Sequence, residues 1–429
     1  MKYNEAIEFL FYDLPNYHNT GYSAIRPGLD NIKKLSEKFN NPHKSYKIVH
    51  VGGTNGKGTS ASSISNICSY NNLKVGLLTS PHIKDFRERI TINGRKIDKD
   101  FIKKFISNNI KIIKNISPSF FELTTIMAFK YFELKKVDLA IIEVGLGGKL
   151  DCTNIVNPII SLISNVSLDH QNILGENIAE IAKEKSGIIK KNSIFIKGEF
   201  QPDIDYVFIN KCNSLKVKYY SSTDKVKIET KRKTINLRDI NVLIDKYKFQ
   251  LTVSNPTNYY LNNLTGIIYV SFKVLKYFKI KITNKSFDGL SAENEKYKIP
   301  GRWQIHSKNP ITILDGCHNL ASINEIINEI NQYSFNKIYF VIGGVIEKNW
   351  NKICSILPTK YTYILTEPNN FRAQKVDNLK SIFDSYGLKY VTQKTVNNAI
   401  DYAKSKSKKN ASPMVSDKSK KSRLTEAST

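Results

Sequence analysis

A glycine-rich loop that follows an apolar run is the feature that most constrains the fold of this chain. In the stretch KIVHVGGTNGKGTSASSI (47–64), a largely apolar run enters a turn with several glycines, one lysine and two threonines. A strand that leaves such a turn as a helix can bind phosphate, because glycines let backbone N–H groups converge and the helix N-terminus adds partial positive charge. Val51 and Gly58 depart from the general pattern G-x-x-x-x-G-K-[ST], so a glycine hairpin with an exposed Lys57 stays the alternative interpretation.

Further apolar runs alternate with helical patterns on the C-terminal side of this loop. The segments KVGLLTS (74–80), VDLAIIEVGLGG (137–148) and NPIISLISNVSLDH (157–170) are typical of buried strands, and helical segments separate them. Continuous apolar strands between helices indicate a parallel sheet covered on both faces. The sequence therefore predicts an α/β fold with a doubly wound, mostly parallel P-loop sheet.

Two domains and a C-terminal tail are expected along the chain. Residues 1–300 form the first domain, which contains the glycine loop, begins with helical segments broken at Pro15 and Gly21 and includes short β-like pieces over 203–250 that are typical of peripheral hairpins. Pro300 and Gly301 mark a boundary, and the strand patterns beyond it predict a smaller, Rossmann-like α/β domain over 301–403. Residues 404–429 hold eight Lys or Arg against two acidic residues, which predicts a disordered basic tail.

Composition limits the alternatives. A formal net charge of +27 would suit nucleic-acid binding, but the lysines are spread along the chain rather than gathered in one patch. The five cysteines are far apart and form no C-x-x-C, which argues against a disulfide framework or a zinc site and favours the reduced cytoplasm. Acidic residues interrupt the apolar N-terminus, and no run of about 18 apolar residues occurs, so neither a signal peptide nor a membrane span is expected.

Polar residues at the predicted strand ends are the candidates for chemistry, because ligands of open parallel sheets gather at the carboxyl ends of the strands. Ser80 and His82 follow one strand, Glu143 ends the next, and Asp169 and His170 follow another. An acid at such a position can reach Mg²⁺ held by nucleotide phosphates, and a histidine beside it can be a second ligand.

Seven ordered blocks then carry a family resemblance. They are HVGGTNGKGT, TSPHIKDFRERI, FFELTTIMAF, IIEVGLGGKLDCTN, SLDHQNILGENIAEIAKEKSGI, PGRWQ and LDGCHN. Together they resemble folylpolyglutamate synthase and dihydrofolate synthase, members of the Mur ligase superfamily, from about residue 17 to residue 400. The loop G-T-N-G-K-G-T is this family's own form of the phosphate loop, and the resemblance implies a sheet of the Mur-ligase central-domain type.

The resemblance implies an ATP-dependent ligase that adds L-glutamate to dihydropteroate or to reduced folates through an acyl phosphate. It implies ATP and two Mg²⁺ ions as cofactors and a carbamylated Lys185, whereas a helix lysine taken alone would be a solvated side chain. A monomer in the cytoplasm, without a nucleic-acid or membrane partner, is expected. The alternatives are another Mur-type amino-acid ligase and a P-loop NTPase that binds nucleic acid.

The resemblance also assigns residues to roles. For catalysis it implies Lys57, His170, Lys185, Arg302 and His318. For the nucleotide it implies Gly53, Thr54, Asn55, Gly56, Lys57, Gly58, Thr59, Asn263, Arg302 and Asp315. For the metal it implies Thr59, Ser80, Glu143, His170 and Lys185, and for the pterin substrate Pro81, His82, Arg89, Phe121, Glu122 and Thr124.

The chain departs from the family pattern in its C-terminal half. The family's H-Q-x-x-N reads YYLNN at 259–263, Leu320 stands where proline is usual, and EKN at 347–349 replaces D-K-D. The apolar strand with which family members end is not found after Ala403. We therefore expect the second domain to lack its last strand and to leave a sheet edge exposed.

Overall fold

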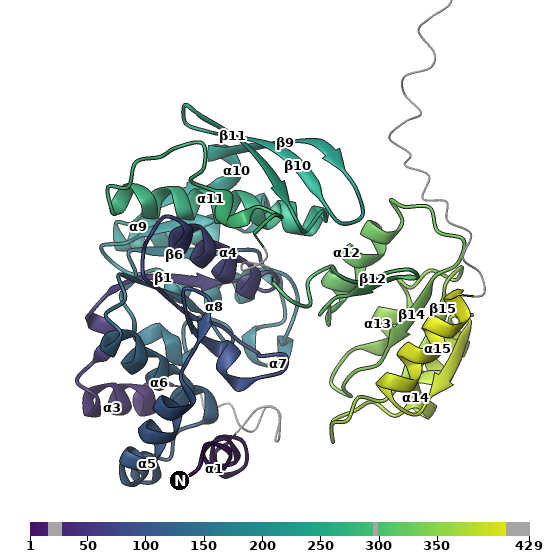
Figure 1. Cartoon of the computed structure of the whole chain (residues 1–429), viewed down its shortest axis with the longest axis horizontal. Coiled ribbons are helices and arrows are strands. Elements are labelled where there is room, and N and C mark those ends of the chain that lie inside the picture. Colours follow the sequence, from purple (N-terminus) through teal and green to yellow (C-terminus); the bar gives the residue numbers. More distant parts are fainter. Residues whose placement is uncertain (16–27, 295–298, 409–429) are drawn as a thin grey trace, which may run out of the picture. The chain divides into compact units, whose positions relative to one another are not determined.

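The computed structural model describes residues 1–15, 28–294 and 299–408 and divides the chain into two compact units (Figure 1). The first unit comprises residues 1–233, 237–254 and 260–299. The second begins with residues 234–236 and 255–259 and continues from Pro300. The predicted boundary near residue 300 does not include residues 234–236 and 255–259, which belong to the second unit.

An eight-stranded sheet forms the centre of the first unit. Its strands are β1 (Lys47–Gly52), β2 (Val75–Leu78), β3 (Ile90–Ile92), β4 (Arg95–Lys96), β5 (Leu139–Glu143), β6 (Ile160–Ile163), β7 (Ile194–Lys197) and β8 (Lys218–Ser221). Their spatial order is β4-β3-β2-β5-β1-β6-β7-β8. All neighbours from β2 to β8 pair in parallel, and only β3 and β4 are antiparallel. The predicted doubly wound, mostly parallel α/β sheet is confirmed.

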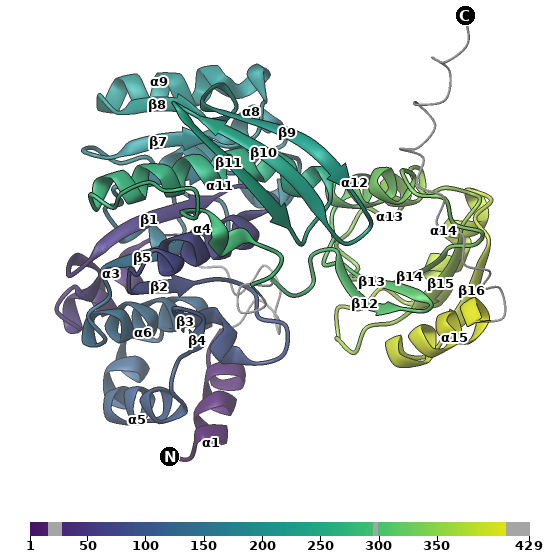
Figure 2. The ribbon, with the colours of Figure 1, turned by 45° about the horizontal axis from the view of Figure 1, so that its top comes forward.

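Helices cover both faces of this sheet (Figure 2). They are α1 (Tyr3–Glu8), α3 (Asp30–Lys38), α4 (Lys57–Tyr70), α5 (Lys99–Ile116), α6 (Phe120–Leu134), α7 (Gln171–Leu174), α8 (Ile178–Lys185), α9 (Asp205–Leu215), α10 (Ser222–Lys225) and α11 (Asn258–Tyr277). Short single turns connect them: η1 (Phe9–Asp13), η3 (Pro42–Lys44), η4 (Phe86–Arg89), η5 (Cys152–Ile155), η6 (Ser186–Ile188), η7 (Pro202–Ile204) and η8 (Asp288–Leu290).

The alternation of side chains along the strands decides which helices pack on which face. Ala140 and Ile142 of β5 join a core with α3, α5 and α6, and Ile163 of β6 joins a core with α8 and α9. On the other face, α4 lies against β1, β2 and β5, and α11 comes close to β6, since a Cβ on Gly266 would lie 3.3 Å from Leu162. Because successive strand residues point to opposite faces, continuous apolar strands are needed to fill both cores.

The N-terminal helices agree with the expected pattern where the structure describes them. Ile32 and Leu35 of α3 are fully buried and Phe39 nearly so, and their spacing places them on one helical face. The helical turns of the first residues end at Asp13, two residues before Pro15. The break expected at Gly21 lies outside the described residues.

The interpretation of residues 203–250 as short β-like pieces is wrong in its first part. Residues 205–215 form α9, because Phe208 and Cys212 are four residues apart and both are buried against the core of α8. Residues 218–221 form β8, which extends the large sheet. The remainder is the expected peripheral hairpin material, a three-stranded antiparallel sheet of β9 (Val226–Lys233), β10 (Arg238–Ile244) and β11 (Tyr247–Val253).

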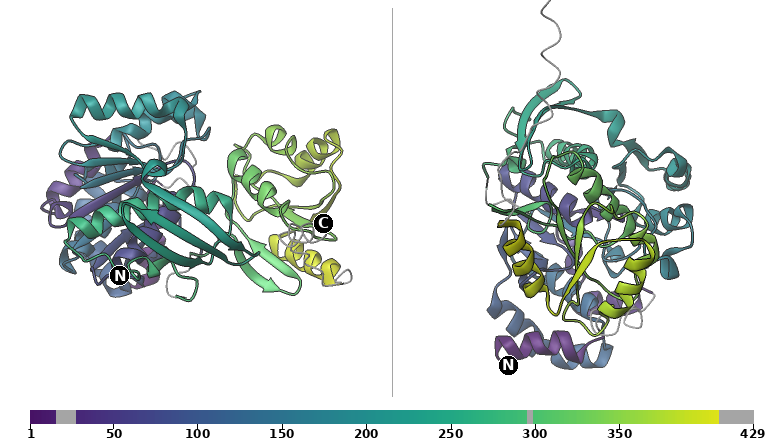
Figure 3. Two further views of the ribbon diagram at one scale, coloured as in Figure 1. Left: turned by 90° about the horizontal axis from the view of Figure 1, so that it is seen from above. Right: turned by 90° about the vertical axis from the view of Figure 1, so that its right-hand side faces the viewer.

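The second unit has its own sheet and core. The elements in chain order are β12 (Gln304–Lys308), β13 (Ile311–Leu314), α12 (Leu320–Ile330), β14 (Tyr339–Ile342), α13 (Trp350–Cys354), β15 (Thr362–Thr366), α14 (Val376–Ser385), β16 (Tyr390–Gln393) and α15 (Val396–Lys408). Strands β14, β15 and β16 are parallel in that order, and β12 and β13 form a separate hairpin. Tyr363 and Leu365 pack with α13 and α14, and α15 covers the opposite face (Figure 3).

The tail predicted to begin at residue 404 is wrong over its first residues. Helix α15 continues to Lys408, because its N-terminal half is anchored on the sheet through the fully buried Ala399. The rest of that prediction lies outside the described residues. Within residues 299–408 no strand follows β16, and across the described ranges no helix is long and apolar enough to cross a membrane.

Candidate active site

The glycine loop lies where the path of the chain reverses across the sheet. Strand β1 is flanked by β5 and β6, and the parallel strands that follow β6 lie on one side while β2 lies on the other. The register places Val51 beside Glu143 and Gly52 beside Ile163. The carboxyl ends of the three strands therefore meet at one edge, which is where open α/β sheets bind ligands.

The loop from Gly53 to Gly56 is held in shape by the residues that follow β6. The backbone N–H of Thr54 donates to the carbonyl of Asn165 (2.9 Å), and that of Asn55 donates to Oδ1 of Asn165 (2.9 Å). The Ser164 hydroxyl donates to the carbonyl of Asn55 (2.7 Å). Gly56 adopts φ +77°, which a glycine tolerates without strain, and α4 begins at the next residue.

The Thr54 side chain is also engaged in this network. Its hydroxyl donates to the carbonyl of Ser167 (3.2 Å) and accepts from the Ser167 N–H (3.0 Å). Thr54 therefore contributes to the shape of the loop through its side chain. Sequence reasoning missed Ser164, Asn165 and Ser167, although polar residues directly after a buried strand were the signal that could have found them.

Two lysines bind neighbouring carbonyls of the loop. Nζ of Lys57 donates to the carbonyl of Thr54 (3.0 Å), and Nζ of Lys185 donates to the carbonyl of Gly53 (2.9 Å). Lys185 is 2% exposed, and burial together with the positive charge of Lys57 lowers its pKa to about 7. The end of α8 is thus brought to the glycine loop, and the carbamylation that the resemblance implies for Lys185 stays a prediction.

Glu143 lies against the first turn of α4. Its Oε2 accepts from the backbone N–H of Ser80 (2.7 Å), and the carboxylate is 2% exposed. A Cβ on Gly58 would lie 3.3 Å from both of its oxygens. The second glycine around Lys57 therefore leaves room for an acid beside the start of the helix.

The donor set at this edge suits Mg²⁺. The Glu143 carboxylate and the hydroxyls of Ser80 and Thr59 are the oxygen ligands that this ion prefers. In the described ranges no three His, Cys, Asp or Glu side chains gather as a metal site, so a bound ion would depend on hydroxyl, water and phosphate oxygens as well. The residues present fit the ion in chemistry.

His170 and Asn263 also lie at this edge. His170 follows β6 with φ +49°, and its Nε2 lies 3.9 Å from Oδ2 of Asp169. Asn263 of α11 approaches the loop so closely that a Cβ on Gly56 would lie 2.6 Å from its Oδ1. The structure therefore brings Asn263 to the glycine loop, and its role in nucleotide binding stays a prediction.

The residues expected to bind the pterin divide into two groups. Arg89 is buried, donates from Nε to Nδ1 of His82 (2.8 Å) and lies with its guanidinium 5.0 Å from the centre of the Phe120 ring. Pro81 is exposed at the start of the same loop. Phe121 is half-buried beside the loop after β5, since a Cβ on Gly145 would lie 2.4 Å from its ring.

Glu122 and Thr124 have structural partners instead. Glu122 is 5% exposed and accepts from the N–H (2.7 Å) and hydroxyl (2.8 Å) of Ser119, which forms a capping box at the start of α6. The fully buried Thr124 hydroxyl donates to the carbonyl of Phe120 (2.7 Å). These bonds use the two side chains within their own helix.

Three further candidates lie together in the second unit. Asp315 accepts from the hydroxyl of Tyr259 (2.7 Å), the N–H of Trp303 (2.7 Å) and the N–H of Cys317 (2.9 Å). A Cβ on Gly316 would lie 2.3 Å from Nη1 of Arg302. The exposed ring of His318 hydrogen-bonds the carbonyl of Gly316 (3.0 Å). The approach of this group to the glycine loop stays a prediction.

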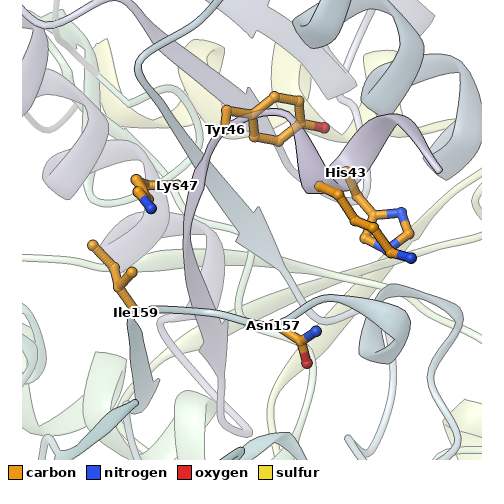
Figure 4. A pocket seen from close by; sticks show the side chains of 6 residues that line it. His43, Tyr46, Lys47, Asn157 and Ile159 are labelled. Atoms are coloured by element: carbon orange, nitrogen blue, oxygen red, sulfur yellow. The ribbon is translucent and has the colours of Figure 1, made fainter. Parts of the chain in front are cut away.

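A separate cavity lies at the other end of β1. His43, Lys44, Tyr46, Lys47, Asn157 and Ile159 line its volume of about 270 Å³ (Figure 4). Because Lys47 begins β1 and Ile159 precedes β6, the cavity opens at the amino edge of the sheet. It contains none of the candidate residues.

Fold and site together define a class of protein: an α/β enzyme with a P-loop-type phosphate site at the switch point of a doubly wound parallel sheet. The Mur ligase middle domain matches residues 51–270, more than half of the 429-residue chain. A dihydrofolate synthase/folylpolyglutamate synthase of Buchnera aphidicola is 32% identical over 80% of this chain and 78% of its own length. This chain belongs to the folylpolyglutamate synthase/dihydrofolate synthase family of Mur-type ligases.

Solved structures agree with this placement. A folylpolyglutamate synthase from Thermotoga maritima has a TM-score of 0.77 at 30% identity and covers 93% of this chain and 91% of its own. An FPGS–AMPPCP–folate complex has a TM-score of 0.78 at 26% identity, with 94% and 99% covered. The chain spans about half the length of a bifunctional folylpolyglutamate synthase/dihydropteroate synthase from Haloferax volcanii, with 27% identity over 90% of this chain.

Proposed function

We propose that this chain is an ATP-dependent ligase that adds L-glutamate to dihydropteroate, to the glutamate tail of reduced folates, or to both. The observation that carries the proposal is the set of charges around the glycine loop: Lys57 and Lys185 on its carbonyls and Glu143 beside Gly58. The relatives and solved structures are named for folate enzymes, and one is a complex with AMPPCP and folate. They favour the folate branch over a ligase for cell-wall precursors.

The proposed reaction activates a carboxylate, which is a poor electrophile by itself. An oxygen of the folate carboxylate attacks the γ-phosphorus of ATP, and ADP leaves. The amino group of glutamate then attacks the resulting acyl phosphate, an amide bond forms, and phosphate leaves. Two anionic groups must meet in the first step, so cationic and N–H groups that offset their repulsion would lower the barrier.

The phosphate loop would supply these groups. The N–H groups at the start of α4 face the phosphates at the positive end of the helix dipole, and Lys57 exchanges the Thr54 carbonyl for phosphate oxygens. Thr59, Ser80, Glu143 and His170 would hold Mg²⁺ directly or through water. The bound ion would screen the phosphate charge and polarise the phosphoryl group.

A carbamylated Lys185 would supply a carboxylate for a second Mg²⁺. Carbamylation requires a neutral amine, because only the free electron pair of Nζ can attack CO₂. Burial lowers the pKa of Lys185 to about 7, so a large fraction of the amine is neutral at physiological pH. The modification would turn a buried cation into an anion.

Pro81, His82, Arg89 and Phe121 would contact the pterin-bearing substrate. The residues Arg302 and His318 would approach the ATP phosphates, and Asp315 would approach the ribose. The three hydrogen bonds that Asp315 accepts within its own unit would compete with that contact. The expected monomeric state, the location in the cytoplasm and the lack of a nucleic-acid partner stay predictions.

Release of ADP tests the proposed function. Purified protein is incubated with ATP, Mg²⁺ and L-glutamate, with either dihydropteroate or tetrahydrofolate as acceptor. Turnover with dihydropteroate identifies dihydrofolate synthase activity, and turnover with tetrahydrofolate identifies glutamate-tail extension. If folded protein releases no glutamate-dependent ADP with either acceptor, the ligase proposal is wrong. Steeply salt-sensitive binding of nucleic acid in that case would favour an NTPase that binds nucleic acid.

A further inference from the structure

The loop from Ser80 to Arg89 presents several candidate substrate residues but has few apolar anchors. Pro81 and Lys84 are exposed, and Ile83 is 58% exposed. Phe86 is the buried apolar side chain that fixes its far end. A loop with so little buried apolar surface depends on hydrogen bonds for its shape.

Two carboxylates accept from backbone N–H groups in this loop: Asp85 accepts from Arg87 (3.0 Å), and Glu88 accepts from three successive residues. Oε2 of Glu88 accepts from the N–H of Ile83 (2.8 Å) and of Lys84 (3.3 Å), and Oε1 accepts from the N–H of Asp85 (3.2 Å). Nζ of Lys96 lies 3.4 Å from Oε1 and so adds a countercharge from β4. Three successive backbone donors thus converge on a single side chain.

The charge of this carboxylate is stabilised where it lies. Burial opposes ionisation of Glu88, but the hydrogen bonds from Ile83 and Lys84 and the charge of Lys96 outweigh it and lower the pKa. Hydrogen bonds to a charged acceptor are stronger than those between neutral groups. The ionised form therefore holds the loop in one shape at neutral pH.

The two ends of the loop connect this shape to the candidate site. Ser80 donates from its N–H to Glu143, and Arg89 donates to His82 across the loop. We infer that Glu88 is a positioning residue that fixes the Ser80–Arg89 loop and so sets affinity for the pterin-bearing substrate. This inference rests on the proposed function for the identity of that substrate. Glu88 acts through backbone groups and has no part in phosphoryl transfer.

The test compares Glu88→Gln with Glu37→Gln, which makes the same charge change on the exposed side of α3. A glutamine offers one carbonyl oxygen and an NH₂ group that cannot accept, so at least one backbone N–H loses its acceptor. For Glu88→Gln we expect the KM for the folate acceptor to rise about tenfold, from the loss of bonds to a charged group. The KM for ATP and kcat should stay near the wild-type values, and Glu37→Gln should change neither.

Hydrogen exchange of the Ile83, Lys84 and Asp85 amides is the second readout and needs no substrate. These amides should exchange faster in Glu88→Gln and unchanged in Glu37→Gln. Should Glu88→Gln fail to fold, Lys96→Met, which removes the countercharge that Glu88 shares with Asp85, should raise the folate KM and the exchange rates by a smaller factor.

Unchanged exchange and unchanged folate KM in a folded Glu88→Gln protein would overturn the inference. A loss of kcat with the folate KM unaltered would also overturn it, because Glu88 would then act in the chemical step. Faster exchange in a protein whose wild type turns over neither acceptor would show the loop function of Glu88 and reject the proposed substrate.

Discussion

At the scale of single residues, the position of Lys57 explains why this loop differs from the general phosphate-loop pattern. Gly58, the residue after Lys57, leaves room for Glu143, whose carboxylate oxygens lie 3.3 Å from where a Cβ would be. The departure that weakens the general motif is the one that accommodates Glu143.

Replacing Lys57 with methionine should nearly abolish ligation. The variant keeps the side-chain stem but loses the cation that offsets phosphate charge, so we expect kcat to fall about 100-fold to 1,000-fold. ADP release under saturating substrates measures the effect. Lys104→Met, at an exposed position on α5, is the matched control. Turnover of Lys57→Met close to that of the control would show that the cation does not act on the transferred phosphoryl group.

Lys185 should make activity depend on bicarbonate and pH. With a pKa of about 7, the neutral amine that accepts CO₂ becomes more abundant as the pH rises through neutrality. We expect bicarbonate to stimulate the enzyme more at pH 8 than at pH 6, and short carboxylates such as formate to restore part of the activity of Lys185→Ala. Lys57→Ala should not respond to them. Failure of rescue in folded Lys185→Ala would contradict the carbamate.

At the scale of elements, the spacing between the start of α4 and the end of β5 sets the geometry of the site. The N–H of Ser80 holds one oxygen of Glu143 in place, and the lack of a side chain at Gly58 leaves room for both carboxylate oxygens. Glu122 of α6 differs from Glu143 in its contacts, because Glu122 and Ser119 cap the N-terminus of their own helix. The pattern S-x-x-E preceding an apolar run was readable as a cap in the sequence, and a substrate role for Glu122 remains a separate prediction.

Gly58→Ala should lower activity while it changes the free energy of unfolding only slightly. Alanine is favoured over glycine within a helix, so the free energy of unfolding should change by no more than about 1 kcal/mol. The new methyl group would press on the Glu143 carboxylate and displace it, which should lower kcat at least about tenfold through lost electrostatic stabilisation. Denaturant unfolding and ADP release measure the two effects, with Ser62→Ala on the same helix as control. Full activity would show that the carboxylate need not lie against the helix.

At the scale of the whole molecule, the chain has separate cores in its two units. The second unit has a core of its own, which includes Trp350, Tyr363 and Phe383. Both tryptophans, Trp303 and Trp350, belong to this unit and are buried. The resemblance assigns Arg302, Asp315 and His318 to ATP, so the ligase activity is expected to need both units folded.

Unfolding of the two units should therefore be separable. Tryptophan fluorescence reports on the second unit, whereas far-UV circular dichroism reports mainly on the larger first unit. We expect the two signals to give different midpoints in denaturant. Leu379→Ala should lower the free energy of unfolding of the second unit by about 2–5 kcal/mol, which lowers the fluorescence midpoint and leaves the main dichroism transition in place. Coincident midpoints that both move in Leu379→Ala would show that the chain unfolds as one cooperative unit.

Local sequence patterns predicted the glycine loop, the doubly wound parallel sheet and the acid at the end of β5. These features depend on local order along the chain: an apolar strand, a glycine turn and a helix in succession. The sequence also placed Glu143 and His170 at the carboxyl ends of two strands of the same sheet, which in the structure lie on either side of β1. Helix α9 was misread because its β-branched and aromatic residues favour strands locally, and burial of one face overrode that preference.

Contacts between residues far apart in the chain become visible in the folded structure. The amine of Lys185 reaches the carbonyl of Gly53, and the residues after β6 hold the glycine loop. No local pattern encodes these contacts, because they depend on the order of strands in the sheet. The burial that lowers the pKa of Lys185 arises from the same packing. Residues adjacent in sequence predict the glycine loop, whereas residues distant in sequence, such as Glu143 and Lys185, place the charges around it.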